Sequence, residues 1–332
     1  MSERRIYNRS MLPAGCESSL EVFDLPQFRL REMVPLLEEE AESWHKFLLW
    51  NYGSSSELVG QFIEAQALNG VVLCDREAPV GYSYFICEER KSLIGCLFVS
   101  SAYRSAESEQ RLLQATLDAI RQRPGIRRVE AQFMLHSFPS VAPPLAGYLE
   151  TYERLFMGAP LPRPQLGTKL VPGGKALRIE HWHERYQDRT AQLIEEAYRG
   201  HLDSSINDQY RSAEGARRFL YNIIQYPGCG TFSPQSSLVA VETGSGQLLA
   251  ACLASIVDDG VGHITQVCTN TRARGLGLGR YLIERSLNEL AALGCHQVTL
   301  TVTANNHGAV KLYTHLGFSV MRRFPAYVWE GL

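Results

Sequence analysis

The sequence predicts an α/β protein in which a mixed sheet flanked by helices occurs twice, as two units in tandem. Segments with the apolar spacing of helices alternate with short β-rich runs, and both halves of the chain repeat one order of elements. A proline- and glycine-rich stretch, residues 157–175, separates the halves. We therefore expect domains at residues 1–160 and 176–332, joined by a linker at residues 161–175.

The second half shows the repeated order most clearly, because its strands are strongly apolar. Helices are expected over residues 188–200, 212–226, 279–293 and 307–316, and strands over residues 237–243, 247–257, 263–270, 297–304 and 319–329. A Ser/Glu capping pattern opens the helix at residues 212–226.

The first half repeats this order with a diverged sequence. Helices are expected over residues 34–49, 56–68 and 110–122, and strands over residues 70–75, 80–88, 93–100 and 126–135. The same α/β unit is therefore expected twice along the chain.

Charge and cysteine usage exclude several classes of protein. Lys and Arg number 33 and Asp and Glu number 35, so no global basic field draws nucleic acid or an anionic membrane. The eight cysteines contain no CxxC pair and most lie in apolar runs, which is typical of buried thiols in a reducing compartment. No apolar stretch reaches the about 20 residues of a membrane span. We expect a cytoplasmic protein with no metal, nucleic-acid or membrane partner.

The segment RARGLGLGRYL, residues 272–282, predicts an anion site. Gly275, Gly277 and Gly279 lack Cβ atoms where a strand turns into a helix, so backbone N–H groups face one concavity at the positive helix end. Such a cradle suits a pyrophosphate. The dinucleotide fingerprint GxGxxG does not fit, because Arg280 and Leu282 stand where small residues are needed. The simpler alternative is a glycine-rich surface turn.

The surroundings of this loop resemble the GNAT family of acyl-CoA N-acyltransferases. The family's glycine loop appears here as Arg274, Gly275, Leu276, Gly277, Leu278 and Gly279. Its NxxAxxLYxxxGF pattern appears as Asn306, Ala309, Leu312, Tyr313, Gly317 and Phe318. The resemblance covers residues 177–332, and the two patterns together at this spacing are far more specific than either one.

The resemblance implies where acetyl-CoA would bind as acyl donor. In this family the fourth and fifth strands splay apart, and the pantetheine arm pairs with the fourth strand, here Val267, Cys268 and Thr269. The pyrophosphate would rest on residues 274–279. Asn306 would bind the pantetheine arm or a bridging water, although Asn at this place also serves as a helix N-cap.

Acyl transfer to an amine requires two titrating groups, because the amine must lose a proton and the departing thiolate must gain one. By its place in the family pattern, Tyr313 is expected to be the general acid, against the alternative that it only packs. His263 is the candidate general base, since imidazole titrates near neutrality. A solvated histidine at a turn, Glu242, or a water chain are the alternatives.

The polar loop at residues 201–211 occupies the place where the family usually recognises the acceptor. Asp203 and Asp208 in this loop could hold a cationic amine, although solvated loop acids are commoner. The expected partner is a small-molecule or peptide amine.

The first half echoes the glycine loop without its glycines. On the same frame the three glycines become Ser105, Glu107 and Glu109, whose side chains and charges oppose a pyrophosphate. The first unit is therefore expected to be a degenerate GNAT fold that binds no cofactor. We expect an acetyl-CoA-dependent N-acetyltransferase with one site in the second half; the alternative is a silent acyl-CoA-binding sensor or scaffold.

Overall fold

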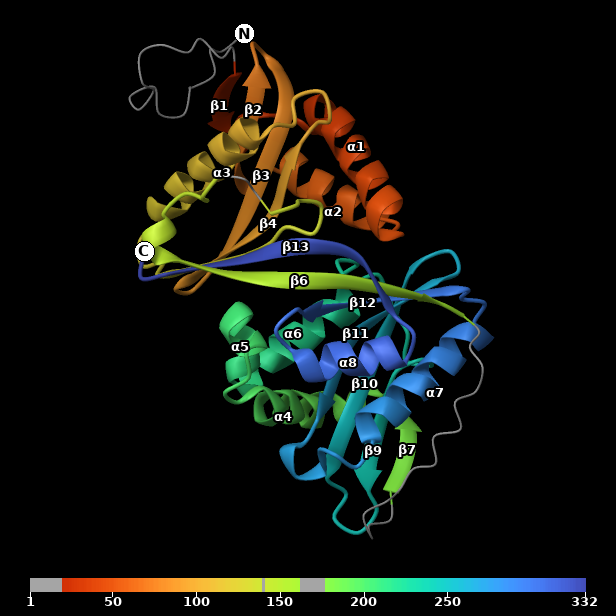
Figure 1. Ribbon diagram of the computed structural model, residues 1–332. Helices are drawn as coiled ribbons and strands as arrows, with labels where there is room; N and C mark the ends of the chain where they lie inside the picture. The colour runs from red at the N-terminus through yellow and green to blue at the C-terminus, as the bar shows by residue number, and fades with distance from the viewer. Residues whose placement is uncertain (1–19, 139–140, 162–176) are drawn as a thin grey trace. The chain divides into compact units, whose positions relative to one another are not determined.

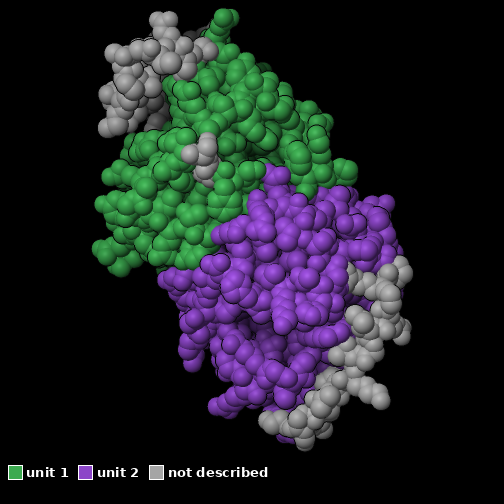
Figure 2. All heavy atoms as spheres, viewed as in Figure 1, with its two compact units in different colours: residues 1–47, 52–152, 324–332 green, residues 48–51, 153–323 purple. Residues whose placement is uncertain are grey.

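The computed structural model of the chain describes residues 20–138, 141–161 and 177–332, so the expected linker lies outside the described residues except for Leu161. The chain forms two compact units (Figures 1 and 2). Unit 1 contains residues 1–47, 52–152 and 324–332, and unit 2 contains residues 48–51 and 153–323. Both units are mixed sheets flanked by helices, as the sequence predicts.

Unit 1 carries a sheet in the order β1-β2-β3-β4-β5-β13, in which β4 and β5 are parallel and the other neighbours are antiparallel. Its strands are β1 (Leu20–Asp24), β2 (Asn69–Asp75), β3 (Ala78–Glu88), β4 (Lys91–Val99), β5 (Arg128–Gln132) and the end of β13 (Ser319–Glu330). Its helices are α1 (Leu30–Leu48), α2 (Gly53–Glu64) and α3 (Ala106–Arg121).

Unit 2 repeats this plan with the order β7-β9-β10-β11-β12-β6, in which β11 and β12 are parallel. Its strands are β7 (Leu177–His181), β8 (Thr231–Phe232), β9 (Leu238–Glu242), β10 (Leu248–Asp258), β11 (Val261–Thr269), β12 (Gln297–Thr303) and most of β6 (Leu149–Pro160). Its helices are α4 (Gln187–Tyr198), α5 (Asp203–Ile206), α6 (Ala213–Gln225), α7 (Leu278–Ala292) and α8 (His307–His315).

Each sheet is completed by a strand from the other half of the sequence. In unit 2, β12 pairs antiparallel with residues 154–160 of β6. In unit 1, β5 pairs antiparallel with residues 326–330 of β13. The compact units therefore differ from the contiguous halves 1–160 and 176–332 at these two strands.

Strands β9 and β10 of unit 2 are almost continuously apolar because helices cover both faces of the sheet (Figure 1). Along β9, Leu238 and Ala240 pack in the cluster with α7, and Val239 and Val241 pack in the cluster with α4 and α6. Side chains alternate in this way because successive residues of a strand point to opposite faces.

The helices of unit 2 follow the sequence patterns closely. The N-cap Ser212 of α6 accepts a hydrogen bond from Gly215 N at 3.0 Å, which confirms the predicted cap. Helix α7 buries Leu282, Ile283 and Leu290 completely. Each such side chain contributes about 2 kcal/mol of burial free energy, so the helix that follows the glycine loop is firmly anchored.

Both sheets open at the same place, as the family resemblance implies. Strand β11 pairs with β12 only at residues 261–264, and residues 265–269 have no strand partner on that side among the described residues. In unit 1, β4 pairs with β5 only at residues 91–94. The two units therefore share the splayed pair of parallel strands.

The described cysteines differ in their exposure to solvent. Cys87 is exposed, so the expectation of a buried thiol is wrong there, whereas Cys252 and Cys268 are buried.

Across the parts of the chain that the structure describes, no helix has both the length and the apolarity needed to cross a bilayer.

Candidate active site

The open edge of β11 is the first component of the site in unit 2. Val267, Cys268 and Thr269 pair with β10 on one side only. The Val267 carbonyl accepts a hydrogen bond from the Tyr198 hydroxyl at 3.4 Å, as expected for a carbonyl that faces the open edge. The strand edge is therefore open beyond residue 264, while its pairing with a pantetheine arm stays a prediction.

The glycine loop lies between a short 3-10 helix, Thr271–Ala273, and the start of α7. Gly275 and Gly277 have φ values of +79° and +77°, a region that disfavours side chains. A Cβ atom at either glycine would meet nothing within 4 Å, so open space lies beside both. Gly277 caps α7 without a side-chain hydrogen bond, which leaves the first amides of the helix uncovered by side-chain caps.

The third glycine and the two leucines support this loop from inside. A Cβ at Gly279 would lie only 3.3 Å from Thr269 Oγ1, so glycine lets the helix approach the end of β11 closely. Leu278 is buried, and Leu276 packs against the same apolar cluster. The loop therefore has the uncovered amides and the open space that an anion cradle requires.

Arg274 does not face the open side of this loop. Its guanidinium donates to the carbonyl of Ala197 at 2.7 Å, near the end of α4. This contact braces the loop against the helix, so any phosphate contact of Arg274 stays a prediction.

Asn306 is the N-cap residue of α8, which is the alternative role expected for it from the sequence. Its Oδ1 accepts from Ala309 N at 3.2 Å at the start of α8, and its Nδ2 lies 3.4 Å from His201 Nε2. Asn306 therefore joins α8 to the loop at residues 201–211, while a contact with a pantetheine arm stays a prediction.

Tyr313 projects from α8 and is half-buried. Burial raises the pKa of its hydroxyl, and the charges of Cys252 and Asp203 raise it further, so Tyr313 stays protonated at physiological pH. The structure gives this hydroxyl no hydrogen-bond partner among the residues it describes. The Tyr313 hydroxyl is therefore protonated and can donate a hydrogen bond to a ligand, while its role as general acid stays a prediction.

His263 lies in an enclosed position near the start of β11. Its Nδ1 lies 2.8 Å from Thr299 Oγ1, and its ring contacts Trp50 and Phe156 at centroid distances of 4.9 and 6.4 Å. Burial lowers the pKa of His263 to about 3. The general-base role stays a prediction, and these surroundings favour packing because they separate the imidazole from solvent.

Glu242, the rival base, ends β9 at a turn and accepts a hydrogen bond from Ser245. In the β9–β10 pair Val241 lies opposite Leu248, two residues before Ala250, and Ala250 lies opposite Thr269 of β11. Glu242 follows Val241, so it lies further along the sheet than the residues level with Thr269. Nothing in this arrangement directs its carboxylate toward Tyr313.

The loop at residues 201–211 contributes a polar cluster that sequence reasoning found only in part. Asp203 Oδ1 accepts from Arg154 Nη1 at 3.3 Å and from the Thr303 hydroxyl, and its Oδ2 lies 3.7 Å from His201 Nδ1. The side chain of His201 is about a quarter exposed, at 27%. Asp203 lies near Tyr313, because its charge contributes to the raised pKa of that tyrosine.

Aromatic side chains line the neighbourhood of this cluster. The ring of Tyr198 contacts His201 edge to face and Tyr210 at a tilt, at centroid distances of 5.1 and 4.6 Å. Gln266 of β11 donates to the Tyr198 hydroxyl at 2.9 Å, and Tyr210 reaches Gln266 at 3.4 Å. Asp208 begins the 3-10 helix Asp208–Arg211. None of these aromatic or amide residues carried a signal in the sequence.

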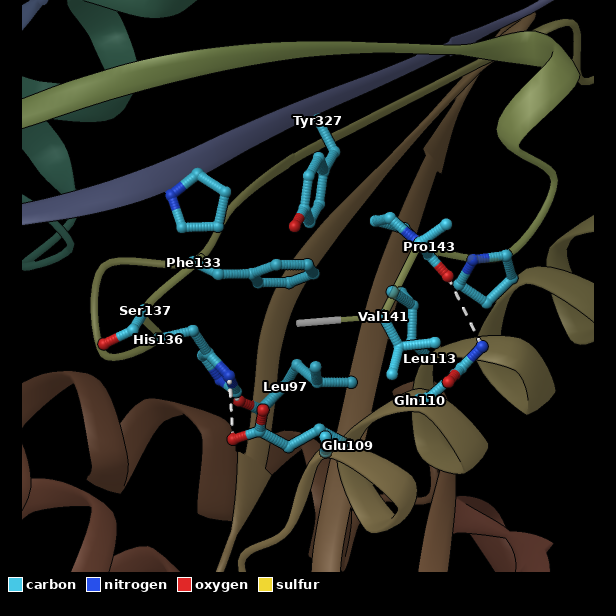
Figure 3. Close-up of a pocket in the computed structure, with 14 residues that line it drawn as sticks. Leu97, Glu109, Gln110, Leu113, Phe133, His136, Ser137, Val141, Pro143 and Tyr327 are labelled. Atoms are coloured by element: carbon cyan, nitrogen blue, oxygen red, sulfur yellow. Dashed lines mark hydrogen bonds and ion pairs between the residues drawn. The ribbon is translucent and has the colours of Figure 1, made fainter. Parts of the chain in front are cut away.

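The equivalent opening in unit 1 is filled by the chain that follows β5 (Figure 3). His136 Nε2 donates to the Leu97 carbonyl of β4 at 2.5 Å, and its Nδ1 lies 3.1 Å from Glu109 Oε1. Arg104 donates to the Val99 carbonyl. A small pocket of about 40 Å³ remains, lined mainly by apolar side chains that include Leu97, Leu113, Phe133 and Tyr327 and by prolines. Protein groups thus use the strand edge that stays open in unit 2.

The two glutamates of unit 1 behave differently from the sequence expectation in one respect. Glu107 and Glu109 both lie in the first turn of α3, but its N-terminus is capped by Ser105, and Glu109 turns toward His136. Burial alone would raise the pKa of Glu109, but the hydrogen bond and charge of His136 and the charge of Arg104 lower it. The obstruction in unit 1 therefore includes His136 as well as the acidic side chains.

Comparisons with known proteins agree with this geometry. The model of the acetyltransferase (GNAT) family matches residues 194–318. A mycothiol acetyltransferase from Beutenbergia cavernae is 30% identical over 149 residues, 45% of this chain and 46% of the relative. Another from Saccharopolyspora erythraea is 39% identical over 88 residues, 26% of this chain and 29% of the relative. The matched segments thus span less than half the length of these relatives.

Solved structures extend the likeness of fold to both units. A GCN5-related N-acetyltransferase from Sphaerobacter thermophilus has a TM-score of 0.66 at 17% identity, covering 95% of this chain and 97% of that one. A tandem GNAT protein from the clavulanic acid biosynthesis pathway has a TM-score of 0.55 at 14% identity, covering 94% and 99%. At these identities the likeness concerns fold alone. The acetyltransferase (GNAT) family model thus matches most of unit 2, and the fold of the described residues is that of two GNAT-like units in tandem.

Proposed function

We propose that the chain is an N-acetyltransferase that moves an acetyl group from acetyl-CoA to a primary amine, at one site in unit 2. The observation that carries the proposal is that the open edge of β11 and the uncovered start of α7 lie in one unit with the unpaired, protonated Tyr313. The match of the GNAT family model to residues 194–318 supports the acyl donor, and the alternative remains a silent acyl-CoA-binding protein.

The backbone of unit 2 would hold the donor. Val267 and Thr269 on the open edge of β11 would pair with the pantetheine arm, and the amides that follow Gly275 and Gly277 would take the pyrophosphate. The αL conformation and the free space beside both glycines support this assignment, because a phosphate must come within hydrogen-bond distance of the backbone.

The acceptor would enter beside Asp203 and His201. In this scheme Asp203 Oδ2 orients the amine, and His201 Nδ1, 3.7 Å from that oxygen, takes its proton in place of the Asp203 backbone N–H that it accepts at 3.1 Å. The amine nitrogen then forms a bond with the thioester carbonyl carbon, the carbon–sulfur bond breaks, and the Tyr313 hydroxyl gives its proton to the departing thiolate. His201 replaces His263 as the candidate base here because it is partly exposed and adjoins the carboxylate.

The experiment measures release of free CoA with a thiol reagent in the presence of acetyl-CoA and a panel of amines. The panel includes polyamines, amino acids, aminoglycosides and peptides, and the acceptor of the mycothiol acetyltransferases comes first because of the similarity to these relatives. Amine-dependent release that Tyr313→Phe suppresses at least tenfold is expected. Tight acetyl-CoA binding with no acceptor-dependent release would favour the silent binding protein instead.

A further inference from the structure

Arg154 enters unit 2 on β6, the strand that the first half of the sequence supplies. It stands opposite Thr303 in the antiparallel β6–β12 pair, at the end of β12 from which α8 follows. Thr303 is buried, and the side chain of Arg154 is only 14% exposed. The exchanged strand thus delivers a guanidinium to the acceptor side of the candidate site.

Two groups determine where this guanidinium lies. Its Nη1 donates to Thr303 Oγ1 at 2.7 Å and to Asp203 Oδ1 at 3.3 Å, and the Thr303 hydroxyl in turn donates to the same oxygen of Asp203. Arg154 Nε is buried and has no hydrogen-bond partner among the described residues. The enclosed side chain is therefore oriented by Asp203 and Thr303.

These contacts give the two carboxylate oxygens of Asp203 different partners. Oδ1 accepts from both Arg154 and Thr303, whereas Oδ2 faces His201 Nδ1 at 3.7 Å. The side chain of Asp203 is 14% exposed, so its negative charge would be poorly compensated without a cationic partner. The carboxylate would then be free to adopt another rotamer. The pair fixes which oxygen is presented to a ligand.

We propose that Arg154 is a positioning residue for acyl transfer: it clamps Asp203 Oδ1 so that Oδ2 faces the acceptor amine beside His201 and Tyr313. The inference rests on the proposed function. The first half of the sequence would then contribute to the site in the second half, because Arg154 lies on β6. The charge of Arg154 also acts on Tyr313, where it opposes the rise of the hydroxyl pKa.

The test compares Arg154→Gln, Arg154→Lys and a matched control, Glu153→Gln. Glu153 is the next residue of β6 and forms an exposed ion pair with Arg323 at 2.7 Å. We expect Arg154→Gln to lower kcat/KM for the acceptor at least tenfold while the acetyl-CoA dissociation constant stays within twofold of the parent. Arg154→Lys should recover most of this loss, and Glu153→Gln should match the parent.

A double-mutant comparison separates positioning from a general loss of structure. If Arg154 acts through Asp203, then Arg154→Gln should have less than a threefold effect in an Asp203→Asn background. Full, independent effects of both substitutions would overturn the proposal, as would an Arg154→Gln protein that keeps the parent kcat/KM for the acceptor. Melting temperatures of all variants identify any that fail to fold; if Arg154→Gln does, Arg154→Met, which keeps an unbranched side chain without the charge, replaces it.

A structural readout distinguishes failure of this inference from failure of the proposed function. If the parent acetylates no amine in the panel, the proposed function fails, and a crystal structure of Arg154→Gln still tests the clamp. Displacement of the Asp203 carboxylate from Thr303 is expected. A carboxylate that keeps its place and orientation without Arg154 would overturn the positioning role whatever the activity.

Discussion

Replacing Gly277 with glutamate tests the cradle with one side chain. The free protein should accept the change, because a Cβ at this position meets nothing within 4 Å. The positive φ of +77° makes any side chain cost about 1–2 kcal/mol of folding free energy. A carboxylate about 5 Å from each negative charge of a pyrophosphate costs about 3 kcal/mol per charge at an effective dielectric constant of about 20. Acetyl-CoA binding should therefore weaken at least 100-fold.

Gly277→Gln is the matched control, because it adds the same bulk and strain without the charge. Calorimetric titration with acetyl-CoA measures the affinity of the parent and both variants, and thermal melts establish that each is folded. The glutamine variant should lie between the parent and the glutamate variant. A folded Gly277→Glu protein with near-parent affinity would show that this loop does not hold the pyrophosphate.

Three further predictions concern chemistry, stoichiometry and acid stability. Tyr313→Phe should reduce kcat at least tenfold with little change in acetyl-CoA affinity, and an unchanged kcat would assign the proton donor elsewhere. Calorimetry should give one acetyl-CoA per chain, since His136 and Arg104 occupy the strand edge of unit 1; two would contradict that reasoning. Folded His263 has a pKa of about 3 against an ordinary 6.5, so the unfolded chain binds the extra proton between these values. Stability should fall as pH drops from 6.5 toward 3, less so in His263→Gln; equal slopes in both proteins would refute this.

The sequence predicted most elements of each unit because local patterns determine them, but it did not predict β1, β6, β7, β8 or α5. The helix at residues 279–293 and its glycine loop could be recognised from apolar spacing and three glycines, and the structure places α7 at Leu278–Ala292. The degenerate loop of unit 1 was also visible, since Glu107 and Glu109 replace glycines. These features depend on neighbouring residues along the chain.

The acceptor side could not be predicted in the same way, because distant segments build it. Arg154 contacts Asp203 and Thr303, residues 49 and 149 positions away. The surroundings of His263 could not be predicted either, since imidazole titration near neutrality suggested chemistry and Trp50, far upstream in the sequence, contacts its ring. A pattern in one half cannot reveal what a strand or loop from the other half will cover.

The exchange of β6 and β13 also constrains how this chain can fold during synthesis. Strand β5 of unit 1 acquires its neighbour only when residues 326–330 have left the ribosome, although β5 itself ends at Gln132. The nascent first half must therefore wait through nearly two hundred further residues with an unpaired strand edge, a state prone to aggregation. Such long-range pairing also slows folding, because a large loop must close before the contact forms. Translation speed across the second half and chaperone supply should thus govern the yield of native protein.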